Sequence, residues 1–198
     1  MKIGEAQQIY REQVKAYQTE KSAISKQLKT IRSRMESSPD GQELYGSEAA
    51  TLELTLSALD EKQKEYQDYL SELADQYCAY WNATVAEQQA DAYKEYGKEM
   101  GKIMEVARRI MKGATVPQSD EKKLMDFSYE LYTAAKTVGE MVKRQKEKDE
   151  EYDTLWGKEE KKEYDDPQEV AENATAASDG PEIVSVEDTL AGVFVAEE

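Results

Sequence analysis

The chain has 198 residues with 42 acidic and 26 basic side chains, so its formal net charge at pH 7 is −16. This acidic surplus disfavours nucleic acids and anionic membranes as partners, because both are bound through clustered Lys and Arg side chains. The chain contains no histidine and one cysteine, Cys78. It therefore lacks the residues for an internal disulfide, for a His-based catalytic triad and for an ordinary zinc site.

Residues 2–36 are predicted to form the first long helix. Apolar and aromatic side chains recur there at alternating intervals of three and four residues, which is typical of a helix packed along another helix. The resulting seam is Ile3, Gln7, Tyr10, Val14, Tyr17, Lys21, Ile24, Leu28, Ile31 and Met35. Residues 37–41, Ser-Ser-Pro-Asp-Gly, are expected to end this helix, since Pro has no amide proton and Asp-Gly favours a turn.

A second helix is predicted over residues 47–81, with Ser47 as its N-cap. Residues 1–36 carry a net charge of +4, whereas residues 47–80 carry −6. The short connection and the opposite charges predict an antiparallel helical hairpin. The seam of the second helix is Leu52, Leu56, Leu59, Gln63, Tyr66, Leu70, Leu73, Tyr77 and Tyr80.

The heptad phase slips at Trp81. Thr84-Val85-Ala86-Glu87 fits a capping box, which would begin a separate helix over residues 84–112. No Gly or Pro interrupts this stretch, so one long bent helix with a stutter is favoured and a true break is the alternative. Gly113 and Pro117 are expected to end the helix. The new seam is Gln89, Tyr93, Tyr96, Met100, Ile103, Ala107 and Ile110.

The next helix is predicted over residues 119–150, with Ser119 as its N-cap, and Tyr152, Leu155 and Trp156 are expected to add one more anchoring turn. Its seam is Leu124, Phe127, Leu131, Ala134, Val138, Met141 and Gln145. We therefore expect an all-α fold in residues 1–156, either an elongated antiparallel helical hairpin or a coiled-coil-like bundle of three to four helices.

Residues 157–198 are predicted to be a disordered acidic tail, because their composition offers too little apolar surface to offset the entropy of ordering. Residues 183–194 form a short apolar segment within this tail. A segment of this length needs a surface to bind before it becomes helical, and that surface is provided either by this chain or by a partner.

The sequence contains no recognisable catalytic motif. Carboxylate pairs such as Asp60-Glu61 lie on predicted polar faces, a di-metal bundle would require Glu-x-x-His pairs, and neither a calcium loop nor a Gly-rich phosphate loop occurs. We expect no catalytic residue, no cofactor and no metal site.

Tyrosine is unusually frequent, at 13 residues, and many tyrosines lie on seams where Leu or Ile would normally dominate. Two interpretations stay open: the rings pack inward with their hydroxyls at the solvent rim, or they line a groove for a partner helix. The candidate partner-binding residues are Tyr66, Tyr77, Tyr80, Trp81, Tyr93, Tyr96, Ile183, Val186, Leu190, Val193 and Phe194.

These patterns predict a non-enzymatic cytoplasmic adaptor or chaperone-like protein. It would bind another protein through its helical surface, with the tail as a solubilising or regulatory tether. The alternative is a structural protein whose heptads associate into a homodimer or a rod. The sequence has no recognisable secretory signal or membrane span, and export without a signal stays open.

Overall fold

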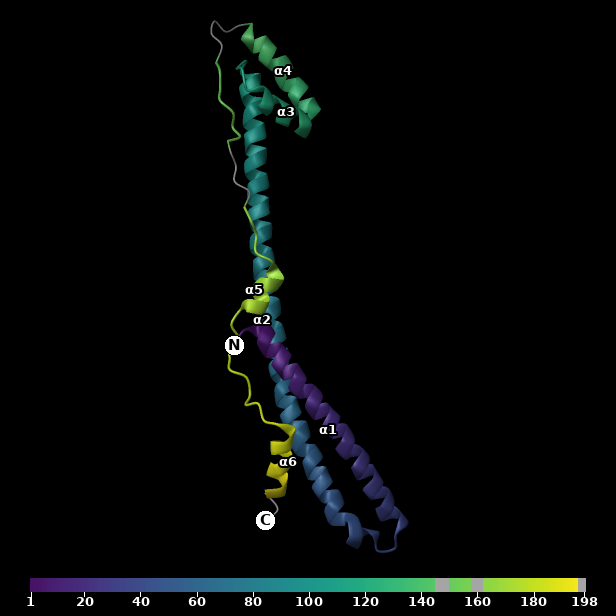
Figure 1. Ribbon diagram of the computed structural model, residues 1–198. Helices are drawn as coiled ribbons and strands as arrows, with labels where there is room; N and C mark the ends of the chain where they lie inside the picture. The colour runs from purple at the N-terminus through teal and green to yellow at the C-terminus, as the bar shows by residue number, and fades with distance from the viewer. Residues whose placement is uncertain (145–149, 158–161, 196–198) are drawn as a thin grey trace. The chain divides into compact units, whose positions relative to one another are not determined.

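The computed structural model describes residues 1–144, 150–157 and 162–195 (Figure 1). For residues 194 and 195 it describes the backbone alone. Apart from isolated bridges, every regular element in this part of the chain is an α-helix, which confirms the predicted all-α class. The chain divides into two compact units, unit 1 comprising Met1–Thr84 with Asp165–Glu198 and unit 2 comprising Val85–Tyr164. The helices are α1 (Ile3–Ser37), α2 (Gly41–Met111), α3 (Gln118–Phe127), α4 (Tyr129–Lys143), α5 (Pro167–Asn173) and α6 (Val186–Val195).

In unit 1, the predicted seams of α1 and the first part of α2 form the core. The two helices run in opposite directions, because Lys21 pairs with Asp60 and Arg32 lies 2.6 Å from Glu53. Exposed pairs of this kind contribute about 1 kcal/mol at most, so they select the register while the buried seam supplies stability. The buried seam residues of this core include Ile3, Tyr10, Tyr17, Ile24, Leu59, Gln63, Tyr66 and Leu73.

Helix α2 begins at Gly41, six residues earlier than predicted. The turn at Pro39 and Asp40 leads directly into the helix, since the Leu44 amide already donates to the Asp40 carbonyl. Ser47 is therefore not an N-cap. It lies inside the helix, where its carbonyl accepts a hydrogen bond from Thr51 Oγ1.

Helix α2 then continues without a break to Met111, so separate helices over 47–81 and 84–112 were a wrong prediction and the favoured continuous helix is confirmed. The Thr84 hydroxyl donates to the Tyr80 carbonyl, four residues earlier in the helix, at 3.0 Å. Thr84 therefore lies inside the helix and is not an N-cap. The phase slip coincides with the boundary between the two units at Thr84. One continuous helix thus contributes side chains to the core of each unit, and in unit 2 the buried part of the predicted seam begins at Ile103. The earlier seam residues Gln89, Tyr93 and Tyr96 are exposed, so that part of the prediction was wrong.

In unit 2, Gly113 ends α2 with a φ of +76°, as its predicted position after the helix requires. The predicted single helix over 119–150 is divided at Ser128, whose backbone is extended and whose Oγ accepts a hydrogen bond from the Leu131 amide. α4 ends at Lys143, and residues 145–149 lie outside the described residues. The seam residues Phe127, Val138 and Met141 are exposed. After the break, α4 instead buries Ala135 and Gly139, so its register differs from the predicted one.

Residues 150–157 belong to unit 2, where they have no helical structure and do not form the predicted helical turn. Asp120, which is almost fully buried, accepts hydrogen bonds from Thr154 Oγ1 at 2.6 Å and from the Leu155 amide at 3.0 Å. Ser119 donates to the same carboxylate, so it does not cap α3. Leu155 and Trp156 pack against the core of this unit, which makes them the anchors that the sequence predicted.

The tail differs from the disordered segment predicted over 157–198, since its described part contains α5 and α6. The Asp166 side chain caps α5 through the Gln168 amide, and Ala171 is fully buried. Val186 and Leu190 of α6 pack against the core of unit 1. The composition of the tail is too polar for a core of its own, but the core of unit 1 gives these apolar side chains a surface.

Candidate interaction site

Four tyrosines of unit 1 form a cluster along the α1–α2 seam, which we call the tyrosine groove: Tyr10 and Tyr17 from α1, Tyr66 and Tyr69 from α2. All four are at most 5% exposed. The ring centroids of Tyr10 and Tyr69 lie 4.8 Å apart in an edge-to-face arrangement, and those of Tyr17 and Tyr66 lie 5.5 Å apart. The rings pack inward, as one of the two interpretations proposed, but their hydroxyls do not reach the solvent rim, so each buried hydroxyl requires a partner within the chain.

The chain's own residues 174–190, which we call the docked segment, provide these partners. Figure 1 shows the segment running beside α1 and α2 before it enters α6. The Tyr10 hydroxyl donates to the Pro181 carbonyl at 2.7 Å, and the Tyr69 hydroxyl donates to the Ser178 carbonyl at 2.9 Å. These two bonds are made to the main chain of the segment, so they do not depend on its side chains.

Tyr66 and Tyr17 hold the next part of the docked segment. The Tyr66 hydroxyl donates to the Glu182 carbonyl at 3.1 Å and accepts from the Val184 amide at 2.9 Å. The Tyr17 hydroxyl lies 2.9 Å from the Val184 carbonyl oxygen and 2.6 Å from Thr189 Oγ1. The groove thus binds both hydrogen-bonding groups of an extended backbone.

Gly180 is the point of closest approach between the segment and the groove. A Cβ atom at this position would lie 2.2 Å from the Tyr10 hydroxyl oxygen and 2.5 Å from a ring carbon of Tyr69. Both distances are far below an ordinary van der Waals contact. Gly is therefore the residue type that lets the backbone lie directly on the two rings.

The beginning of the docked segment is bound by the N-terminus of the chain and by α2. The Ile3 amide donates to the Ala174 carbonyl at 2.9 Å, and the Ala176 amide donates to the Met1 carbonyl at 3.0 Å. The Ala177 amide donates to Gln76 Oε1 at 2.9 Å. Main-chain recognition therefore extends over the whole stretch from α5 to α6.

Burial changes the acid–base behaviour of the groove. It raises the pKa of Tyr10 and Tyr17 above the usual value of 10.0. Burial also raises the pKa of Tyr69, with a further contribution from the nearby carboxylate of Asp179. The hydroxyls are therefore protonated over the physiological range and can donate to the carbonyls of the segment.

The predicted partner-binding residues fall into three groups. Tyr66 is completely buried in the groove, and Tyr77 is half-buried beside it, so neither presents a free surface. On unit 1, Tyr80 and Trp81 are exposed, and on unit 2, Tyr93 and Tyr96 are exposed by 77% and 63%. In the tail, Ile183 is exposed, Val186, Leu190 and Val193 are half-buried, and the side chain of Phe194 lies outside the described residues.

Three parts of the site were missed from the sequence: Tyr69, Gly180 and the extended stretch before residue 183. Tyr69 is one helical turn from Tyr66 but lies off the predicted seam. A usable signal was present, because several tyrosines on one seam need several hydrogen-bond partners. Gly180-Pro181 also marked a point where a backbone could approach another surface closely.

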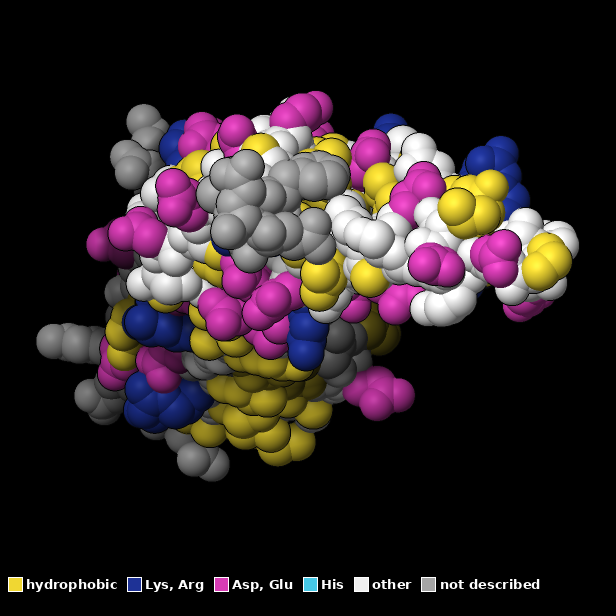
Figure 2. Space-filling model, turned by 90° about the horizontal axis from the view of Figure 1, so that it is seen from below, with side chains coloured by type: hydrophobic (Ala, Val, Ile, Leu, Met, Phe, Trp, Pro, Cys, Tyr) yellow, Lys and Arg dark blue, Asp and Glu magenta, His cyan; other side chains and the backbone are white. Residues whose placement is uncertain are grey.

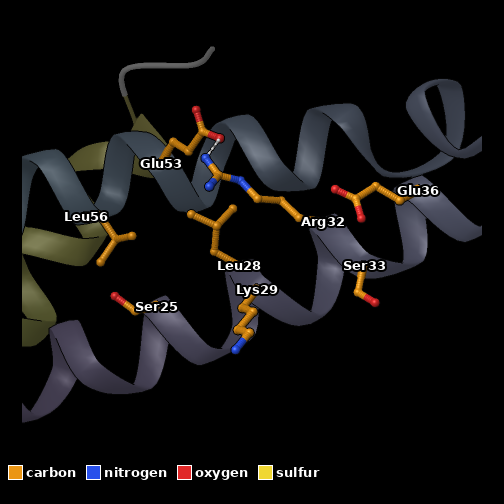
Figure 3. Close-up of a pocket in the computed structure, with 8 residues that line it drawn as sticks. All are labelled: Ser25, Leu28, Lys29, Arg32, Ser33, Glu36, Glu53 and Leu56. Carbon is orange, nitrogen blue, oxygen red and sulfur yellow. Dashed lines mark hydrogen bonds and ion pairs between the residues drawn. The ribbon is translucent and has the colours of Figure 1, made fainter.

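A second groove, near the turn between α1 and α2, offers less chemistry (Figure 3). Leu28 and Leu56 lie between the two helices, and Arg32 reaches across to Glu53. Lys29 points away from α2. The apolar floor is covered by the ion pair of Arg32 and Glu53, and the other charged side chains of the lining, Lys29 and Glu36, have opposite signs, so this groove favours neither an anionic nor a cationic ligand.

Other features of the surface do not single out a site. In the view of Figure 2, acidic side chains are dispersed, and hydrophobic side chains gather in a patch at the lower centre. Within the described ranges, no group of three acidic or Cys side chains is placed to hold a metal ion. A search of the same residues finds no helix that is both long and apolar enough to cross a membrane.

Comparison of the chain with protein-family models, with curated proteins and with solved structures finds no match.

Proposed function

We propose that this is a non-enzymatic, cytoplasmic protein-interaction protein of the adaptor or chaperone-like kind. In this proposal α1 and α2 form a coiled-coil-like hairpin that displays the tyrosine groove. The observation that carries the proposal is the set of main-chain hydrogen bonds from the four tyrosines to the docked segment. The buried rings direct their hydroxyls toward the docked segment. A surface of this kind is suited to hold an extended segment of another protein as well.

The docked segment would then be the regulatory part of the molecule. It is tethered to the groove that it fills, so its effective concentration there is in the millimolar range for a short flexible tether. A partner's segment would have to bind more tightly than the tethered segment does at its effective concentration, or the tail would have to dissociate from the groove first. The tail thereby sets the threshold for binding.

A synthetic peptide with the sequence of residues 174–190, carrying a fluorescent label, tests this function. We expect weak binding to the full-length wild-type chain, because its own tail competes. The Gly180→Ala chain should bind the same peptide at least about tenfold more tightly, since its tail no longer fits beneath Tyr10 and Tyr69.

Gly157→Ala is the matched control, because no atom lies within 4 Å of the added methyl group. This variant should bind the peptide as the wild type does. If the Gly180→Ala chain fails to bind the peptide at millimolar concentration, the groove is not exchangeable and the proposal is wrong.

Self-association is a second candidate function, favoured by the exposed rings of Tyr93 and Tyr96 on α2. They lie on the predicted seam, where burial against another helix would be expected. Light scattering over a dilution series distinguishes the two functions. A stable dimer that Tyr93→Ser and Tyr96→Ser together dissociate would support self-association, and a monomer at all micromolar concentrations would exclude it.

A further inference from the structure

A groove along α1 and α2, distinct from the tyrosine groove, combines unpaired positive charge with an unsatisfied buried amide. Arg11, Lys15 and Lys26 line it, together with Gln18, Ser22 and Gln63, and none of its lining residues is acidic. We call it the basic groove. The chain as a whole has a net charge of −16, whereas this groove is lined by three cations and by no acidic residue.

The three cations are available for a ligand. Lys21 and Arg32 of the same helix pair with Asp60 and Glu53. Arg11, Lys15 and Lys26 are exposed and, within the residues that the structure describes, form no ion pair. Their charges therefore attract an anionic partner without first breaking an existing contact.

The groove also contains an acceptor that the fold leaves unsatisfied. Gln63 is only 4% exposed, and its Nε2 donates to Gln18 Oε1 at 3.0 Å. Its Oε1 has no hydrogen-bond partner. Buried amide oxygens are nearly always paired, and this one is closed off from solvent, so a donor from another molecule reaches it once the Gln63 side chain turns toward the groove that it lines.

The spacing of the cations points to a helix as the occupant. Arg11 and Lys15 are one turn apart, and Lys26 lies about three turns further along, so the three charges extend over about 22 Å of one helix face. Ser22 and Ala23 lie between them and are small enough to let another helix approach closely. A helix laid into the groove between two helices follows the usual ridge-and-groove packing.

We propose that the basic groove binds an acidic amphipathic helix of a partner protein. Carboxylates on that helix pair with Arg11, Lys15 and Lys26, its small apolar residues face Val14 and Ala23, and one side-chain donor reaches Gln63 Oε1. At about 100° of rotation per residue, Arg11, Lys15 and Lys26 lie roughly 100–180° around α1 from Tyr10 and Tyr17. Binding here is therefore independent of the proposed exchange of the docked segment.

The probe is an alanine-based helical peptide of about 18 residues with glutamates at the spacing of the three cations and one Asn opposite Gln63. Fluorescence anisotropy with the full-length protein should show binding that weakens as salt is added, because the contacts are ionic. A peptide with Gln in place of each glutamate is the control for charge. Equal binding of the two peptides, or no binding of the acidic one, would overturn the proposal.

Two triple variants with the same net charge locate the site. Arg11→Gln, Lys15→Gln and Lys26→Gln together should weaken binding of the acidic peptide at least about tenfold. The matched set, Lys64→Gln, Lys94→Gln and Lys98→Gln, removes three exposed lysines outside the groove and should leave binding unchanged. Equal losses in both sets would show general charge attraction and refute a site in the groove.

Two further measurements separate this proposal from others. Light scattering that finds a dimer dissociated only by the groove triple would assign the groove to a second copy of the chain, against the proposal. Gly180→Ala should leave binding of the acidic peptide unchanged, so a failure of this proposal is distinguishable from a failure of the exchange proposed for the tyrosine groove.

Discussion

Substitution of Gly180 by Ala should release the docked segment from unit 1. The added Cβ would lie 2.2 Å from the Tyr10 hydroxyl oxygen and 2.5 Å from a Tyr69 ring carbon, so both rings would have to retreat by about 1 Å to reach normal contact. Neither can do so easily, because they pack edge to face with centroids 4.8 Å apart and are 3% and 5% exposed.

The size of the effect follows from what the displaced rings lose. The hydrogen bonds of Tyr10 to Pro181 and of Tyr69 to Ser178 contribute about 1 kcal/mol each. Overpacking costs about another 1–3 kcal/mol, of which relaxation of the segment recovers part. We therefore expect a loss of about 3 kcal/mol in the free energy of docking, which corresponds to about a hundredfold increase in the open fraction.

Native-state amide hydrogen exchange, read by mass spectrometry, measures this opening directly. Amides in residues 176–190 should exchange about a hundredfold faster in the Gly180→Ala chain, while the amides of α1 change little. Gly157→Ala, which meets no atom within 4 Å, should exchange like the wild type. If the two variants show the same protection over residues 176–190, the steric argument is refuted.

Further predictions concern the groove, its pH dependence and the two cores. Tyr66→Phe leaves the Glu182 carbonyl and the Val184 amide without their partner, so the docked segment should lose about 1–3 kcal/mol of docking free energy, measured by hydrogen exchange. Because the pKa values of three groove tyrosines are raised in the folded chain, their contribution to stability is fully present below pH 10.0 and lost as pH rises through the folded pKa values. Tyrosinate absorbance at 295 nm should therefore show a fraction that titrates late, together with release of the segment. Asp120→Asn leaves one acceptor oxygen and removes the charge where the carboxylate accepts from the Leu155 amide on one oxygen and from the Ser119 and Thr154 hydroxyls on the other, and should destabilise unit 2 by about 1–3 kcal/mol in thermal melts. Ile24→Asp places an unpaired charge in the α1–α2 core, and should lower stability by about 4 kcal/mol, read as lost helical circular dichroism on heating.

Each of these predictions has a matched control or a clear contrary outcome. Tyr93→Phe, at a ring that is 77% exposed, should not alter protection, and equal effects of the two Phe variants would contradict the role of the groove. Late titration would be contradicted by a single tyrosine transition near pH 10. Asp126→Asn and Ser25→Asp introduce the same side chains at exposed positions. If either control melts as early as its buried counterpart, burial is not the cause of the loss.

The sequence alone determined the α-helical class and most of the α1–α2 core of unit 1. The alternation of three and four residues predicted which side chains of α1 are buried, because a helix that packs on another helix must turn the same face to it along its length. The charge of the two segments and the Pro39-Asp40-Gly41 turn indicated the pairing that Arg32 and Glu53 now show. Those signals are local or periodic, so they can be read without knowing the fold.

Only the tertiary structure decided the course of the tail and the identity of the groove. Residues 157–198 are too polar to fold alone, and their composition contains no record of the surface on which α5, residues 174–185 and α6 lie. The hydroxyls of Tyr10 and Tyr66 bind main-chain groups of residues more than 100 positions away, and main-chain groups are the same in every sequence. The break at Ser128 was hidden for a similar reason, since a serine is compatible with a helix until packing requires it to cap one.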